Sequence, residues 1–117
     1  MKIIFIILLT HYVADFLLQT HEQAINKSKC FKALFGHVLT YSLAFLPVAL
    51  CIFEYTSVAL VWWGFNMAMH FFTDAATSKI NASVYDKDCL RPLFIGVGAD
   101  QLIHYITLFG SYSLLAN

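Results

Sequence analysis

Four long apolar stretches occupy most of this 117-residue chain and constrain its fold more than any other feature. They cover residues 3–19, 33–53, 57–76 and 92–115, and a helix needs about 20 apolar residues to cross the hydrocarbon core of a bilayer. Apolar residues make up 60% of the chain and charged residues 12%, against roughly 45–50% and about 25% in soluble domains. The sequence predicts an all-α, polytopic membrane protein, a four-transmembrane-helix bundle that forms a single domain over residues 1–117.

The charge balance and the cysteines exclude two other classes of protein. Seven basic and seven acidic residues give a net charge of zero, whereas a nucleic-acid-binding surface needs a basic surplus. Three cysteines are an odd number, and none of them forms a C-x-x-C motif, which does not suit a disulfide scaffold. We therefore expect membrane lipid, and no nucleic acid, as a partner.

The basic residues indicate how the spans are oriented. The two long links, residues 20–32 and 77–91, contain Lys27, Lys29, Lys32, Lys79, Lys87 and Arg91. The opposite side contains only Lys2. Because cytoplasmic loops are enriched in Lys and Arg, we expect an integral protein of the inner (cytoplasmic) membrane. Both long links are then cytoplasmic and both termini lie outside.

An internal repeat relates the two halves of the chain. The spacing of His11 and Asp15 recurs at His70 and Asp74, and the same offset of 59 residues pairs two cysteines, Cys30 and Cys89. Four extra residues then shift the offset to 63, which aligns His37 with Asp100 and Tyr41 with His104. The repeat predicts two duplicated helical hairpins, related by a pseudo-two-fold axis along the membrane normal.

Seven ionisable side chains fall inside the apolar stretches, where a mid-helix Asp costs about 2.5–3.5 kcal/mol on insertion scales. They are His11, Asp15, His37, His70, Asp74, Asp100 and His104. Residues four apart share one helix face, so each helix presents a polar stripe. If alternate helices run in opposite directions, the four stripes lie at the same depth in the membrane. We expect the seven side chains to converge on one site with two layers.

Imidazole and carboxylate groups together suit divalent transition metals. We expect all seven side chains to be metal ligands, with Zn favoured and Fe, Mn, Co or Ni as alternatives, for one ion or for two. Asp74 and Asp100 are the candidate catalytic residues, since one of them is free to act as a general base. The expected surrounding shell consists of Gln19, Tyr41, Asn66 and Gln101. The alternative is a purely structural set of hydrogen-bonded polar groups.

Four motifs resemble a family of small bacterial and phage membrane proteins known as domain of unknown function 3307. They are HYVADFLLQT at 11–20, His37, HFFTD at 70–74 and DQLIH at 100–104. The resemblance covers nearly the whole chain, and it carries over the seven ionisable residues together with Gln19 and Gln101. It implies no activity.

Three functions compete for this constellation. The first is a membrane-embedded metal-dependent hydrolase acting on a lipid or lipid-linked substrate, with Lys79, Lys87 and Arg91 placed to receive an anionic headgroup. The second is a divalent-cation or proton transporter or channel that uses the same site, for which a homodimer is expected because four helices are few for alternating access. The third is a phage-type pore or a membrane subunit of a partner. An enzyme needs a lipid-sized pocket beside the metal, whereas a transporter needs a polar path beyond the site.

Overall fold

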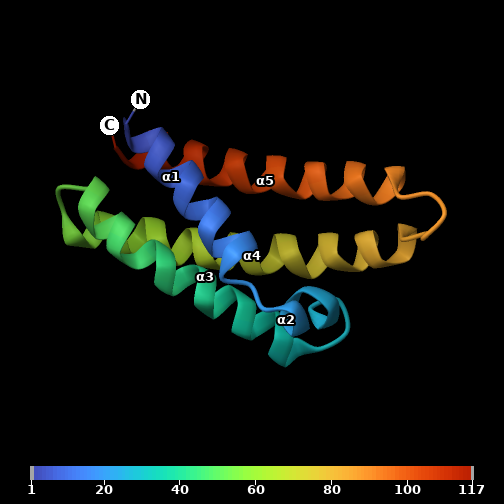
Figure 1. Ribbon diagram of the computed structural model, residues 1–117. Coiled ribbons are helices and arrows are strands. Elements are labelled where there is room, and N and C mark those ends of the chain that lie inside the picture. The colour runs from blue at the N-terminus through green and yellow to red at the C-terminus, as the bar shows by residue number, and fades with distance from the viewer. Residues whose placement is uncertain (1, 117) are drawn as a thin grey trace.

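The chain is described by a computed structural model over residues 2–116, and every regular element in that range is a helix (Figure 1). The elements in order are α1 (Lys2–Tyr12), a π-helical turn η1 (Val13–Leu17), α2 (His21–Asn26), α3 (Phe31–Ile52), α4 (Thr56–Val84) and α5 (Arg91–Leu115). The all-α expectation is thereby confirmed.

The long helices are arranged as two antiparallel pairs. Helix α1 continues through η1 and packs against α3, and α4 packs along α5 (Figure 1). Helices α3 and α4 also pack extensively against each other, which joins the two pairs. Helix α1 begins and α5 ends at the same end of the bundle (Figure 1). This arrangement is what two helical hairpins require, and their origin by duplication stays a prediction.

The two links differ from the sequence expectation. The third apolar stretch was expected to end at residue 76, but helix α4 continues to Val84. It continues because residues 77–84 contain no glycine or proline to stop the helix. The first link contains α2, which starts with a capping box. The Thr20 Oγ1 accepts from the Gln23 amide at 3.2 Å, and the Gln23 side chain accepts from the Thr20 amide at 2.9 Å.

Within residues 2–116, two helices, α3 and α5, are long and apolar enough to cross a membrane by length and composition. Helix α1 is shortened as an α-helix by the π turn after Tyr12. Helix α4 has a lower mean hydropathy than α3 because it carries a polar stripe through its middle. The four-span arrangement therefore stays a prediction.

The apolar core fills the end of the bundle where α1 begins and α5 ends. Trp62 of α4 is fully buried, and its ring lies 6.0 Å from the ring of Phe45 and 5.7 Å from that of Phe53. Ile7 of α1 and Leu108 of α5 close the same cluster. This core holds all four long helices in place on one side of the polar residues.

Trp62→Ala should destabilise the bundle by about 3–5 kcal/mol, because it removes a buried aromatic side chain from a packed core. Phe72 is a matched control, since it is an aromatic residue of the same helix that is 65% exposed. Unfolding of both variants in detergent micelles measures the difference. An equal loss of stability in Trp62→Ala and Phe72→Ala would contradict this account of the core.

A candidate metal centre between four helices

The seven predicted side chains lie in one continuous buried network, named here the His/Asp cluster. Each member is at most 7% exposed. The members are His11, Asp15, His37, His70, Asp74, Asp100 and His104, and they come from α1, η1, α3, α4 and α5. The convergence of the four polar stripes that the sequence predicts is present in the structure.

A π turn positions the first carboxylate. The Leu18 amide donates to the Val13 carbonyl at 2.9 Å, which is the i→i+5 bond of a π-helix. The widened turn places Asp15 in the bundle interior, where its Oδ1 lies 3.0 Å from His37 Nε2. Its Oδ2 accepts from Gln101 Nε2 at 2.8 Å. Single π turns occur frequently at functional sites.

Four atoms in the cluster lie close enough together to surround one metal ion. They are Asp15 Oδ1, His37 Nε2, His70 Nε2 and Asp74 Oδ2, and they all lie within 4.8 Å of one another. His37 Nε2 lies 3.0 Å from the Asp15 oxygen, 3.2 Å from the Asp74 oxygen and 3.1 Å from the His70 nitrogen. His70 Nε2 lies 3.7 Å from the Asp15 oxygen and 3.8 Å from the Asp74 oxygen. Ligands about 2.0–2.1 Å from a tetrahedral zinc ion are about 3.3 Å apart.

The hydrogen bonds among these atoms are incomplete. Asp15 Oδ1 is buried and accepts no hydrogen bond from any described residue, although a ring nitrogen lies 3.0 Å away. His37 Nε2 carries at most one hydrogen, yet it faces two carboxylate oxygens and a second ring nitrogen. Buried polar atoms are normally satisfied. A cation at the centre of the four atoms would satisfy all of them, so these residues fit a divalent metal.

A second group of possible ligands shares Asp15. Atoms of Asp15, Asp100 and His104 also lie within 4.8 Å of one another. His104 Nε2 is 3.4 Å from Asp100 Oδ1 and 3.2 Å from Asp74 Oδ1. Asp100 Oδ1 also accepts from Thr77 Oγ1 at 2.5 Å. The chemistry of this group suits a second ion, with Asp15 between the two positions.

His11 differs from the other members because the hydrogen-bond partners of both ring nitrogens are neutral, although Asp15 Oδ2 lies 3.7 Å from its Nε2. Nδ1 lies 3.0 Å from the Tyr41 hydroxyl, and Nε2 lies 2.8 Å from Gln101 Oε1. The sequence places His11 among the ligands, whereas the geometry gives it the role of supporting Tyr41 and Gln101. The Tyr41 ring in turn stacks on His70, with centroids 3.7 Å apart and an interplanar angle of 8°.

The remaining residues expected around the ligands, Gln101, Asn66 and Gln19, differ in how directly they contact the cluster. Gln101 bridges the site, since its Nε2 donates to Asp15 and also to Asp100, at 3.1 Å. Asn66 donates to the Trp62 carbonyl and to Ser111 rather than to the cluster. Gln19 reaches the cluster only through Lys27.

Lys27 is a member of the site that the sequence analysis treated only as a basic link residue. Its Nζ donates to Asp74 Oδ2 at 2.8 Å and to Gln19 Oε1 at 3.1 Å, and its side chain is 18% exposed. The residue follows α2, which turns the chain back toward the bundle (Figure 1). The capping-box pattern at Thr20 and Gln23 is the sequence signal that indicates this helix.

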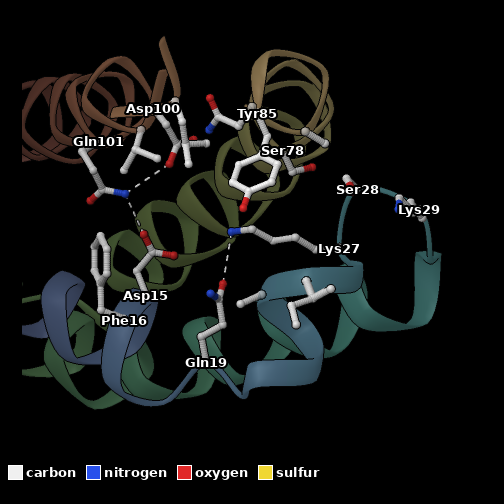
Figure 2. Close-up of a pocket in the computed structure, with 16 residues that line it drawn as sticks. Asp15, Phe16, Gln19, Lys27, Ser28, Lys29, Ser78, Tyr85, Asp100 and Gln101 are labelled. Carbon is white, nitrogen blue, oxygen red and sulfur yellow. Dashed lines mark hydrogen bonds between the residues drawn. The ribbon is translucent and has the colours of Figure 1, made fainter. Parts of the chain in front are cut away.

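A pocket of about 650 Å³ opens next to the His/Asp cluster, between the η1–α2 segment and the facing parts of α4 and α5 (Figure 2). Asp15, Asp100 and Gln101 line its inner end. Figure 2 shows Lys27 reaching into the pocket toward Gln19. The basic residues that line it are Lys27 and Lys29, not the three in the second link that the sequence analysis considered.

The comparisons with known proteins agree with the sequence motifs. The model of the family described as "Protein of unknown function (DUF3307)" matches residues 3–116, and the chain belongs to this family. The resemblance noted from the four motifs is thereby confirmed. No curated protein and no solved structure matches the chain.

The purified protein should carry about one or two equivalents of a divalent transition metal, because one group of four and one group of three possible ligands each lie within 4.8 Å of one another. Asp15→Ala and His70→Ala each remove one ligand and should lose most of this metal. His21→Ala is the control, since His21 is exposed on α2 and should keep the metal content of the unmodified protein. Elemental analysis by mass spectrometry measures the content. Folded unmodified protein without stoichiometric metal would exclude the metal centre.

Proposed function

We propose that this member of the DUF3307 family is an integral membrane, metal-dependent hydrolase that acts on a lipid or lipid-linked substrate. The observation that carries the proposal is the pocket of about 650 Å³ that ends on Asp15 and Asp100 of the His/Asp cluster. Pockets of about 300–1,000 Å³ are typical of small-ligand sites. A site of metal-ligating side chains with such a pocket beside it is the arrangement that catalysis needs.

The distribution of side chains supports a location in the membrane. The His and Asp side chains of the cluster are buried, while large apolar side chains face outward on each long helix, such as Phe5, Leu43, Phe72 and Ile106. Outward-facing apolar groups contact lipid favourably, and intramembrane ionisable groups turn toward the bundle interior. We propose four spans, with both basic links in the cytoplasm and both ends of the chain outside.

Zinc is the metal that the proposed ligand set suits best, since two imidazole nitrogens and two carboxylate oxygens are donors that zinc binds, and they lie within 4.8 Å of one another. A divalent ion held there would acidify a water molecule that joins it as a fifth ligand, and so would supply a nucleophile at neutral pH. The chain contributes a second group of possible ligands, Asp15, Asp100 and His104, of which Asp15 and Asp100 line the pocket.

Asp100 is the better of the two candidate general bases. It lines the pocket, and Thr77 and Gln101 donate hydrogen bonds that orient its carboxylate. Asp74 does not line the pocket, and His37, His104 and Lys27 enclose it. A general base must reach a proton next to the substrate, so we propose Asp100 as the base and Asp74 as a ligand.

The apolar core favours the hydrolase over the transporter. On the side of the cluster away from the pocket, the bundle is filled by fully buried apolar residues that include Ile7, Trp62 and Leu108. A transporter needs a polar path that continues past the site. The polar groups beyond the cluster, Asn66 and Ser111, bond to each other and to helix carbonyls within this packed region.

Asp100→Asn should lower the hydrolysis rate by about 10²–10⁴-fold, which is the usual contribution of general acid–base catalysis. The metal-loaded protein is assayed in mixed micelles against a panel of phospholipids and polyprenyl phosphates, with the products detected by mass spectrometry. Asp88→Asn is the control, because Asp88 lies in the exposed link before α5. Wild-type turnover by Asp100→Asn would remove Asp100 as the base, and no turnover by the unmodified protein would reject the panel substrates.

The proposed orientation predicts which thiols an impermeant reagent reaches in spheroplasts that express the protein. A cysteine placed at Glu54, in a background with Cys30, Cys51 and Cys89 replaced by serine, should react with an impermeant maleimide from outside. The variant that keeps only Cys89 should react only after the membrane is permeabilised. Both positions are exposed, so burial does not explain a difference. The opposite pattern would invert the orientation.

A further inference from the structure

The pocket beside the His/Asp cluster is lined by both polar and apolar side chains. Phe16, Ile25, Leu93 and Val97 contribute apolar surface to its lining. Asp15 and Asp100 line its inner end, and the polar residues nearer the links are Lys27, Ser28, Lys29, Ser78, Asn81 and Tyr85. A pocket of this composition suits an amphipathic molecule whose polar end lies beside the residues nearer the links.

Two polar side chains of α4 that line the pocket lack hydrogen-bond partners among residues 2–116. Ser78 is 8% exposed and its Oγ is buried without a partner, and Asn81 Oδ1 is buried in the same state. Buried polar groups in native structures are normally satisfied by protein, water or ligand. The Ser78 hydroxyl can donate, so it is a lining group without a partner that an acceptor could satisfy.

Lys27 supplies positive charge at the boundary between the pocket and the cluster. Its Nζ donates to Asp74 Oδ2, which is one of the four atoms of the proposed ligand set. A divalent ion in that set would repel a neighbouring ammonium group and would take its carboxylate partner. The lysine stem is flexible and its ammonium group binds phosphate as a point charge. The pocket that Lys27 lines is where the released ammonium group can lie (Figure 2).

We propose that the pocket binds a phosphate group, and that Lys27 moves from Asp74 to this phosphate when a divalent metal occupies the cluster. This inference rests on the proposed function and specifies its substrate class as a phosphate-bearing amphipathic molecule. Lys27 is then a positioning and specificity-determining residue rather than a metal ligand. The apolar walls select a molecule with a hydrocarbon chain over a free phosphate.

Binding rather than turnover tests the proposal, so the Asp100→Asn protein in detergent micelles is used. Zinc-loaded protein is titrated with three probes, dihexanoyl phosphatidic acid, dihexanoylglycerol and inorganic phosphate, and binding is followed by calorimetry. We expect phosphatidic acid to bind at least about tenfold more tightly than dihexanoylglycerol. Inorganic phosphate binding as tightly as the lipid would support phosphate recognition and identify a free phosphate as the ligand.

Three variants and one chelation separate the possible outcomes. Lys27→Met should weaken phosphatidic acid binding by about tenfold or more while keeping its zinc, and Lys27→Arg should restore most of it. Lys79→Met is the control, because Lys79 does not line the pocket. Removal of zinc with a chelator should weaken binding to the same extent as Lys27→Met.

Two results would overturn the inference. One is equal affinity for phosphatidic acid of the Asp100→Asn protein with and without the Lys27→Met change when both carry zinc. The other is equal affinity of the Asp100→Asn protein for phosphatidic acid and dihexanoylglycerol. Phosphate binding that depends on Lys27 without any hydrolysis of the lipid panel would refute the proposed hydrolase and retain the phosphate site.

Discussion

The burial of three carboxylates and four imidazoles in a small apolar bundle is the constraint on which the rest of the structure depends. An isolated charge is costly to remove from water, so buried charges must be paired, hydrogen-bonded or bound to metal. Each carboxylate of the His/Asp cluster meets this demand through side chains from another helix. The cluster therefore links η1, α3, α4 and α5 as firmly as the apolar core does.

Several features of the chain follow from this demand. The π turn carries Asp15 into the interior, and helix α2 returns the chain so that Lys27 reaches Asp74. Gln101 bridges two carboxylates that would otherwise repel each other. The missing hydrogen bond at Asp15 Oδ1, and the two carboxylate oxygens and one ring nitrogen that surround His37 Nε2, mark where a cation fits. The proposed metal centre and the proposed phosphate pocket are thus parts of one electrostatic arrangement.

Helical spacing allowed much of the fold and of the site to be predicted. His–Asp pairs four residues apart share a face of a helix, and the alternating direction of the helices brings the pairs to one depth. Local sequence patterns did not predict which contacts individual side chains make. His11 reads as a ligand by its pairing with Asp15, yet its ring nitrogens bond to Tyr41 and Gln101. The sequence pattern predicts Lys27 only as a charged residue of a link. Its contact with Asp74 could not be predicted, because that contact depends on how α2 packs against α3.

The helical state of the chain, its two long basic links and the stripes of polar residues can all be inferred from the sequence. These properties follow from periodicity and composition, which are local. The packing of the helices sets which nitrogen and oxygen atoms lie close enough to share an ion, that α4 and α5 leave a pocket beside them, and that Lys27 enters it. The rotation and depth of each helix depend on packing between residues distant in the chain, such as Trp62 with Phe45 and Phe53, and no local pattern specifies them.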